Sequence, residues 1–467
     1  MKRIVIVGGG ISGLATAYYT LKKAKAAGAD VSVQVLEAGP GFGGKITTVR
    51  EAGFIVEGGP DSFISLKPEA IDLCEELGMA DELVCTDNAH KRTFILCAGR
   101  LEEIPEGMES MAPSRFWPFA MTGLLSVEAK LRVLGELFVP VRRADTDESV
   151  ADFIERRLGP EFYRNIAEPL LSGIYAGDAR TLSLRATLPR LAEMEKAHGS
   201  LTKAILAARR RPAPAGAGWT TFVTLKGGVA RLVERLVSVL ELEGAALQSR
   251  SPVASLQRAH GGYVVTLEGG AELQADVLVL ATPAYESARL LRGIDGRLAA
   301  EMEQIHYNPA ATVSLAYPRD RFPNRLDGFG FVVPRAEGRA LLACTWTSSK
   351  YPGRTPDGHV LLRGYLGSNR RETWQKLTDE QLGFLVREDL GGILGIWQEP
   401  VFTRVFRWER AMPQYGVGHL KWAHSVTQKS RSHPGLYLTG AAYRGVGIPD
   451  CVKDALQTAD LLIHTPA

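Results

Sequence analysis

Two segments with the same local pattern lie at opposite ends of this chain, and they restrict its fold more than any other feature. The first is RIVIVGGGISGLATAYY at residues 3–19, and the second is GLYLTGAAYRGVGIPDCV at residues 435–452. Each reads as an apolar strand, a glycine turn and a helix, which is the repeating unit of a doubly wound α/β sheet. The sequence therefore predicts one such domain assembled from both ends of the chain.

The glycine turn at the N-terminus has the spacing of a dinucleotide-binding site. Gly8, Gly10 and Gly13 form a GxGxxG motif between the strand Ile4–Val7 and a helical pattern. Gly8 permits the tight turn, Gly10 lets the backbone approach a diphosphate, and Gly13 permits close packing of helix on strand. The N–H groups at the start of the helix would bind the diphosphate.

An acidic residue ends the second predicted strand, Val31 to Leu36. The Glu37 carboxylate can accept hydrogen bonds from both ribose hydroxyls, and it would repel a 2′-phosphate. This favours FAD or NAD over NADP. Two further glycine loops, GFGGK at residues 41–45 and GGPDS at residues 58–62, offer the close backbone approaches that a long, buried dinucleotide needs, so we predict FAD.

The C-terminal unit then has a role at the other end of the same cofactor. We expect Gly445, Val446, Gly447 and Ile448 to lie against the flavin. The helix that starts near Asp450 would direct its positive end at the flavin N1–C2=O edge, where negative charge gathers on reduction. The alternative is a C-terminal helix that serves packing alone.

The predicted secondary structure changes twice in the middle of the chain. Residues 110–210 are mostly helical in pattern, residues 211–218 (RPAPAGAG) form an irregular connection, and residues 252–284 read as an antiparallel meander followed by strand-rich sequence to residue 406.

The formal net charge of +3 gives no electrostatic argument for nucleic acid. Five cysteines without a CxxC pair indicate reduced, buried thiols, and Met1-Lys2-Arg3 leads directly into a strand, so we expect a cytoplasmic protein without a bound metal.

One uncharged segment, FWPFAMTGLLSV at residues 116–127, is too short to span a bilayer. It could be a buried or half-buried helix. It could also be a surface that touches a membrane or delivers an apolar substrate.

These motifs together resemble the protoporphyrinogen/coproporphyrinogen oxidase family of the flavin amine oxidase superfamily. The markers run through nearly the whole chain: GGGISGLATAY, EAGPGFGGKI, VEGGPDSF, EPLLSGIYAGD, GFGFVVPR, ACTWTSSKYP, RWERAMPQYGVGH and TGAAYRGVGIPDC. SGIYAGD and MPQYxxGH are more specific to the family than GxGxxG. ACTWTSSKYP and GIPDC are most similar to the branch found in Gram-positive bacteria, whose members oxidise coproporphyrinogen III to coproporphyrin III in heme biosynthesis.

The resemblance implies an α/β fold in three parts. A discontinuous doubly wound FAD-binding domain would comprise residues 1–65, 219–295 and 407–467. A sheet-based substrate domain would comprise residues 66–89 and 296–406, and an all-helical domain residues 90–210. The substrate pocket would lie between these domains, with the flavin at its floor.

The resemblance also implies site residues. FAD contacts would fall on Gly8, Gly9, Gly10, Ile11, Ser12, Gly13, Glu37, Ala38, Lys45, Gly59, Pro60, Asp61, Ser62, Val253, Trp408, Val446, Gly447 and Ile448. Substrate contacts would fall on Gly173, Ile174, Phe329, Val332 and Tyr365, because apolar and aromatic walls suit a flat macrocycle. Animal and plant members hold a propionate with an arginine where this chain has Thr93, which leaves Arg92, Arg100 and Lys45 as candidates for that role.

The resemblance further implies the reaction. A porphyrinogen loses six electrons, two at a time as hydride to flavin N5, and oxygen reoxidises the flavin with release of hydrogen peroxide. We expect the flavin to carry this step without a catalytic side chain. Membrane contact and a transient ferrochelatase partner are further expectations.

Four other interpretations remain open. Protoporphyrinogen IX is the second candidate substrate. An amine oxidase of the same superfamily would usually carry Gly-Glu where this chain has Gly440-Ala441-Ala442, and would frame the amine with an aromatic pair, of which Tyr443 is only one. A carotenoid-type desaturase and a flavin-free chaperone of prenylated GTPases are more distant alternatives.

Overall fold

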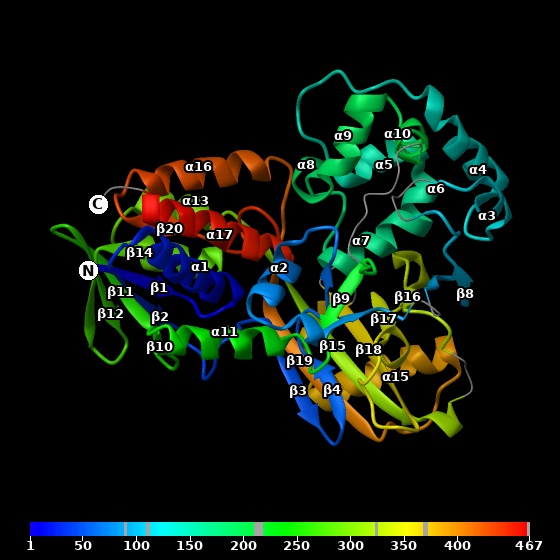
Figure 1. Cartoon of the computed structure of the whole chain (residues 1–467). Coiled ribbons are helices and arrows are strands. Elements are labelled where there is room, and N and C mark those ends of the chain that lie inside the picture. The colour runs from blue at the N-terminus through cyan, green and yellow to red at the C-terminus, as the bar shows by residue number, and fades with distance from the viewer. Residues whose placement is uncertain (88–90, 109–112, 210–217, 323–325, 368–371, 465–467) are drawn as a thin grey trace.

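The computed structural model of this chain describes residues 1–87, 91–108, 113–209, 218–322, 326–367 and 372–464. Figure 1 shows a layered α/β part that contains both α1 and α17, a helical part that contains α3 to α10, and a second sheet-based part below the helices. The predicted connection at residues 211–218 and the domain limits at residues 90 and 210 fall almost entirely on residues outside these ranges.

The layered part is built on a five-stranded parallel sheet of order β10-β2-β1-β14-β20. Its strands are β1 (Lys2–Val7), β2 (Val31–Leu36), β10 (Ala246–Gln248), β14 (Val277–Leu280) and β20 (Leu436–Leu438). The first and last of these come from the two ends of the chain, as the sequence predicts. The prediction of a doubly wound α/β domain is confirmed.

Side chains at alternate positions of β1 point to opposite faces of the sheet, and both faces are apolar. Ile4 and Ile6 pack under α1 (Ile11–Ala27), α2 (Glu69–Glu76), α11 (Ala230–Leu242) and α17 (Ile448–His464). Val5 and Val7 pack under α12 (Ala284–Leu291), α13 (Gly296–Met302) and α16 (His419–Arg431). Residues on alternate positions of a strand point to opposite faces, so β1 is buried on both sides.

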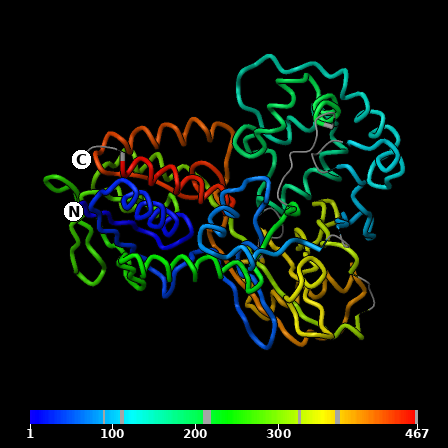
Figure 2. Tube along the Cα trace, viewed as in Figure 1, coloured from blue at the N-terminus to red at the C-terminus, as the bar shows by residue number. Residues whose placement is uncertain are grey.

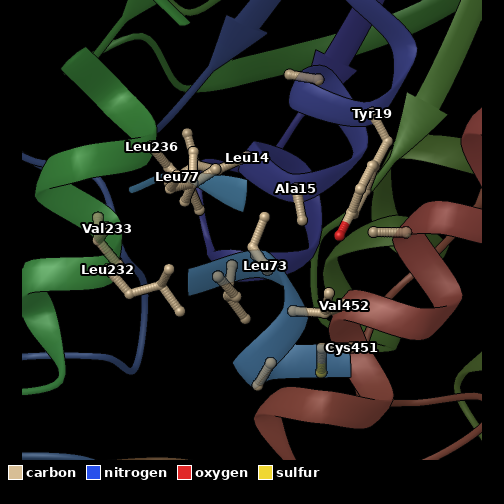
Figure 3. Close-up of a cluster of buried hydrophobic side chains, with 14 of the residues drawn as sticks. Leu14, Ala15, Tyr19, Leu73, Leu77, Leu232, Val233, Leu236, Cys451 and Val452 are labelled. Carbon is tan, nitrogen blue, oxygen red and sulfur yellow. The ribbon is translucent and has the colours of Figure 1, made fainter. Parts of the chain in front are cut away.

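Figure 3 shows how the first of these faces is filled. Leu14 and Ala15 of α1 meet Leu73 and Leu77 of the α2 region, side chains of α11, and Val452 of α17. α1 and α17 lie side by side along their length (Figure 2), so the two glycine turns that precede them are held in one structure.

The second large sheet has seven strands, in the order β19-β15-β18-β17-β16-β7-β8. These are β7 (Thr93–Cys97), β8 (Arg100–Glu103), β15 (Tyr307–Pro318), β16 (Gly330–Val332), β17 (Ala343–Trp346), β18 (His359–Gly367) and β19 (Phe402–Pro413). Helix α15 (Asp379–Leu394) covers one face. Smaller sheets pair β3 (Thr48–Glu51) with β4 (Phe54–Glu57), and β5 (Phe63–Ile64) and β6 (Leu83–Cys85) with β9 (Phe222–Leu225).

The helical part has a core of its own. Its helices are α3 (Phe116–Met121), α4 (Val127–Leu134), α5 (Val150–Leu158), α6 (Pro160–Phe162), α7 (Glu168–Tyr175), α8 (Leu184–Thr187), α9 (Pro189–His198) and α10 (Leu201–Arg209). The strands β7 and β8 fall within the range expected for this domain, but β7 pairs with β16 and β8 pairs with β7. Residues 93–103 thus extend the seven-stranded sheet, and the first helix begins at Phe116.

The predicted meander is correct for only three strands. β11 (Val253–Ala259), β12 (Gly262–Leu267) and β13 (Glu272–Ala275) are antiparallel. The next strand, β14, instead lies parallel to β1 and β20 in the first sheet. Its four residues are all buried, which is typical of a central parallel strand and not of a meander with one exposed face.

The apolar segment at residues 116–127 is half-buried, with Leu124 and Leu125 in the core, and it also exposes large apolar side chains. Phe119 is buried, but Trp117 and Met121 are more than 70% exposed. In the described part of the chain, no helix combines the length and the apolar character that a bilayer crossing requires.

Candidate active site

The turn between β1 and α1 is closed by contacts that only glycine permits. Gly8 has a φ of +109°, and a methyl group on Gly13 would lie 1.9 Å from the Gly8 carbonyl oxygen. Gly10 differs from both, since a methyl group there would meet no atom within 4 Å and its φ is −72°. The chain itself therefore gives no steric reason for glycine at position 10, and the space beside it is the space that a diphosphate needs.

Glu37 is fixed beside this turn. Its carboxylate accepts the Gly9 N–H at 2.8 Å and the Gly39 N–H at 2.7 Å, one on each oxygen. A carboxylate has about four acceptor positions, so two remain for ribose hydroxyls. Ala38 follows in the same loop, and the Ser251 N–H donates to the Glu37 carbonyl at 2.8 Å, which brings the segment before Val253 alongside.

The second glycine loop docks on the first. The Gly43 N–H donates to the Gly9 carbonyl at 2.8 Å, and a methyl group on Gly59 would lie 1.7 Å from the Lys45 carbonyl oxygen. The Lys45 ammonium donates to the Ala411 carbonyl, and burial lowers the pKa of Lys45 to about 8. The Trp408 indole N–H donates to the Gly58 carbonyl at 2.9 Å, so β19 holds this loop in place.

The loop at residues 58–62 is also tied to the seven-stranded sheet. Asp61 forms an ion pair with Lys350 at 3.3 Å, Ser62 donates to Asp61 at 2.7 Å, and Arg363 donates to the Gly59 carbonyl at 2.6 Å. Burial by itself would raise the pKa of Asp61, but the nearby Lys350 and Arg363 cations lower it to about 2. The loop thus carries a permanently ionised carboxylate between two cations.

The C-terminal glycine turn is braced from behind by Tyr415. Its hydroxyl donates to the Ala441 carbonyl at 2.7 Å and accepts the Gly445 N–H at 2.8 Å. The ring stacks on buried His419 at 3.7 Å between centroids. Val446, Gly447 and Ile448 follow directly, at the start of the 17-residue helix α17. The Asp450 carboxylate accepts the Gly447 N–H at 3.3 Å.

The expected substrate residues gather where α7 crosses the seven-stranded sheet. Val332 pairs with Ala343, and Ala343 pairs with Tyr365, so these three side chains lie on one face. A methyl group on Gly173 would lie 3.6 Å from a methyl of Val332, which places α7 on this same face. Ile174 is 58% exposed, and Phe329 donates its N–H to the Arg92 carbonyl at 2.8 Å just before β16.

Sequence reasoning missed several supporting residues. Tyr415 and His419 lie within the MPQYGVGH motif but contact residues of the C-terminal glycine turn, 24 to 30 residues further on. Lys350 reaches Asp61 over 289 residues, and Arg363 reaches the Gly59 carbonyl over 304 residues. MPQYGVGH itself was a visible signal for the first pair. Lys350 lies within the ACTWTSSKYP marker, but nothing local connects it or Arg363 to the loop at residues 58–62, because long-range contacts leave no local pattern.

The residues of the three loops fit FAD. They combine the space beside Gly10, the spare acceptor positions of Glu37, and the N-termini of α1 and α17 brought together by the packing of those helices. Anionic groups are favoured at both helix starts.

Comparison with known proteins agrees with this geometry. The family model of flavin-containing amine oxidoreductases matches residues 11–463. A coproporphyrinogen III oxidase of Bacillus subtilis (strain 168) is 37% identical over 97% of this chain and 96% of its own length. The chloroplastic protoporphyrinogen oxidase of Oryza sativa subsp. japonica is 31% identical over 97% of this chain and 87% of its own length.

A solved structure gives the same result for the fold. It is a protein from Exiguobacterium sp. 255-15 that carries a provisional protoporphyrinogen oxidase name. It covers 99% of this chain and 98% of its own, with a TM-score of 0.87 and 34% identity. The chain therefore belongs to the flavin-containing amine oxidoreductase family, and its cofactor is FAD.

Proposed function

We propose that this protein oxidises coproporphyrinogen III to coproporphyrin III in heme biosynthesis, with oxygen as the electron acceptor. Each porphyrinogen would lose six hydrogens, and three molecules of oxygen would become three of hydrogen peroxide. The observation that carries the proposal is the apolar face formed by Val332, Ala343 and Tyr365 under α7, next to loops that fit FAD. The relatives named above supply the substrate class.

The residues of the site would act by binding and positioning. Bound FAD supplies the redox step as a two-electron acceptor. Val332 and Tyr365 would form one wall for the macrocycle, and Gly173 would let α7 approach it closely. Burial raises the pKa of Tyr365 to about 12, so its hydroxyl stays neutral at physiological pH and can hydrogen-bond but does not act as a base. We propose in addition that no side chain is an essential acid or base in this reaction.

One observation weighs against the amine oxidase alternative. Tyr443, the single aromatic residue of the expected amine-framing pair, is 1% exposed within the core beneath α12, α13 and α16. Its ring stacks on Trp422 at 6.0 Å. It therefore lies in the packing layer and does not frame a pocket.

The direct test offers coproporphyrinogen III and protoporphyrinogen IX separately to the FAD-loaded protein in air and follows porphyrin fluorescence. We expect a higher kcat/KM for coproporphyrinogen III, with three molecules of hydrogen peroxide per porphyrin. A higher value for protoporphyrinogen IX would replace the proposed substrate with the second candidate. Oxidation of neither would overturn the proposal.

We further propose that the helical part docks on an anionic membrane surface from the cytoplasmic side. Exposed apolar side chains gather on α3, α4 and the turn that follows: Phe116, Trp117, Met121, Val127, Leu131 and Phe138, each 56–87% exposed. Lys130 donates to the Ala120 carbonyl at 2.8 Å, which joins the two helices into one surface. Arg115 directly precedes α3 and pairs with Glu106 at 2.7 Å, and its remaining N–H donors would face lipid phosphates.

Cosedimentation with phosphatidylglycerol vesicles tests the membrane proposal. We expect binding that the Trp117→Ser/Phe138→Ser double variant loses. Phe384→Ser, which removes a 56% exposed side chain from α15, is the matched control and should bind as the parent does. Equal binding by both variants would overturn the proposal, and capture of ferrochelatase by this surface without vesicle binding would assign it to that expected partner instead.

A further inference from the structure

Three polar side chains lie together on one face of the seven-stranded sheet, in a part of it that is closed to solvent. Ser314 of β15 pairs with Arg363 of β18, and Thr312 of β15 pairs with Tyr365 of β18. Paired residues of adjacent strands, and alternate residues of one strand, point to the same face. Thr312, Ser314 and Arg363 are 6%, 1% and 3% exposed. This buried polar group therefore adjoins Tyr365 of the wall proposed for the macrocycle.

A loop that is expected to contact FAD covers these side chains. Arg363 donates to the Gly59 carbonyl at 2.6 Å. A methyl group on Gly58 would lie 2.6 Å from the ring of Phe406, and Phe406 of β19 pairs with Thr312. The polar group thus lies between the sheet and the cofactor-binding loop.

Three polar atoms of this group have no hydrogen-bond partner among the described residues. They are the hydroxyl oxygens of Thr312 and Ser314 and Nε of Arg363. Thr345, on the same face, differs because its hydroxyl donates to the Tyr365 hydroxyl at 3.3 Å. Buried polar atoms are nearly always hydrogen-bonded, so three unpartnered ones on one face indicate a small polar ligand.

Arg363 also carries a buried charge that no carboxylate of its own neutralises in the described part of the chain. Around the loop, Glu57 pairs with Arg354 at 3.2 Å, and Asp61 pairs with Lys350 at 3.3 Å. With Arg363 there are three cations and two acids, which leaves one net positive charge. Charges interact strongly where water is excluded, so this guanidinium would stabilise an anion that forms beside it.

The enclosure of the site restricts which ligand can use it. A carboxylate from solution would lose its hydration on the way into a closed site, which is unfavourable. Molecular oxygen is small and uncharged when it enters, and it becomes an anion only after it has accepted an electron. A buried cation beside two free hydroxyls suits that sequence of events.

We propose that Arg363, Thr312 and Ser314 form the site at which oxygen is reduced. The inference rests on the proposed function and assigns residues to its oxygen-consuming half. Oxygen accepts one electron and becomes superoxide, which the guanidinium stabilises and the hydroxyls hydrogen-bond. It then accepts a second electron and two protons and leaves as hydrogen peroxide. The reduced cofactor supplies both electrons and one proton, and solvent supplies the second proton. Arg363 transfers no proton in this step.

The test starts from FAD-loaded protein that is reduced under nitrogen with a stoichiometric amount of dithionite, so that no porphyrinogen takes part. Mixing with oxygenated buffer and following the return of the oxidised-flavin absorbance gives the rate constant of reoxidation. Arg363→Met removes the charge, and Thr312→Val and Ser314→Ala each remove one hydroxyl. Arg404→Met is the matched control: Arg404 of β19 pairs with Ser314, but its side chain is 39% exposed and forms an ion pair with Glu51.

We expect Arg363→Met to slow reoxidation by at least about tenfold. Thr312→Val and Ser314→Ala should each slow it by about threefold, and Arg404→Met should leave it unchanged. The midpoint potential of the bound FAD and its Kd supply readouts that do not depend on turnover. Loss of a cation beside the reduced, anionic cofactor would leave that potential unchanged or lower it, and a lower potential favours reoxidation. Slower reoxidation in Arg363→Met would therefore assign the charge to oxygen and not to the cofactor.

Reoxidation of Arg363→Met at the parent rate or faster would overturn the inference, and so would equal slowing in Arg404→Met. If Arg363→Met loses FAD because Gly59 is released, the Thr312→Val/Ser314→Ala double variant decides, and an unchanged rate there would assign the unpartnered atoms to structural water. If the reduced FAD of the parent does not reoxidise in air, the inference fails together with oxygen as the acceptor. Oxidation of coproporphyrinogen III would then still be testable without oxygen, so the two failures are distinguishable.

Discussion

His419 is a buried imidazole that supports the flavin-side loop from behind. It is 5% exposed, stacks on Tyr415 and hydrogen-bonds through Nε2 with the Tyr443 carbonyl at 3.2 Å. Burial lowers the pKa of His419 to about 4, although the Tyr443 carbonyl acts in the opposite direction. In the unfolded chain an imidazole titrates near pH 6.5.

The sign of the pH effect follows from these two values. Between pH 6.5 and 4 the unfolded chain takes up a proton at His419 and the folded protein does not, so stability is lost as pH falls through that window. The expected loss is about 3 kcal/mol. We predict that His419→Gln, measured by thermal unfolding from pH 7.5 to 4, flattens this decline. Parallel pH profiles for parent and variant would contradict the prediction.

Substitutions of Gly10 and Gly13 should affect different properties: FAD binding at Gly10 and the stability of the fold at Gly13. A methyl group on Gly13 would meet the Gly8 carbonyl at 1.9 Å, whereas one on Gly10 meets no protein atom. We predict that Gly13→Ala lowers the stability of the FAD-free protein by about 1–3 kcal/mol. Gly10→Ala should leave that stability unchanged but weaken FAD binding by at least about tenfold. Isothermal titration with FAD and thermal unfolding of both variants provide the check, and full FAD affinity in Gly10→Ala would be the contrary result.

At the scale of elements, an ion pair joins the loop at residues 58–62 to helix α14 (Thr347–Lys350). The Lys350 side chain is 11% exposed and that of Asp61 is 14% exposed. Removal of one partner leaves a buried charge without its counterion, which costs about 3–5 kcal/mol when the pair is fully buried.

We predict that Lys350→Met destabilises the protein by about 2–4 kcal/mol and raises the pKa of Asp61. Asp61→Asn combined with Lys350→Met should regain part of the loss, because no buried charge is then left alone. Chemical unfolding of the two single variants and the double variant measures this coupling. Additive losses across the double-mutant cycle would show that the two residues do not support each other.

The arrangement of the strands and helices could be predicted from the sequence only in part. Strand–glycine–helix units at both ends were readable because each is local, and packing of α1 on α17 unites them. The placement of β14 was not readable, because a four-residue apolar strand fits a meander or a parallel sheet equally well until its neighbours are known. The pairing of β7 with β16 joins residues more than 200 positions apart and likewise has no local signal.

For the whole molecule, the glycine loops expected to bind FAD could be read from the sequence as a set, whereas the ion pair between Lys67 and Asp450 could not. Lys67 and Asp450 are 383 residues apart in the chain and 2.6 Å apart in space. This contact forms only when the connection between β5 and α2 packs beside α17. A single lysine in a connecting loop has no sequence pattern that predicts such a contact. The candidate site is therefore a product of the global arrangement, with the flavin-binding loops on one side and the helical part on the other.

The central claim is that a porphyrinogen delivers its electrons to FAD held by these loops. The most direct measurement is an anaerobic titration of the FAD-loaded protein with coproporphyrinogen III, followed in the flavin absorbance band and by porphyrin fluorescence. Six electrons per porphyrinogen and two per flavin predict that one coproporphyrinogen III reduces three flavins and appears as one coproporphyrin III. Flavin that stays oxidised while coproporphyrinogen III is present in excess would contradict the account.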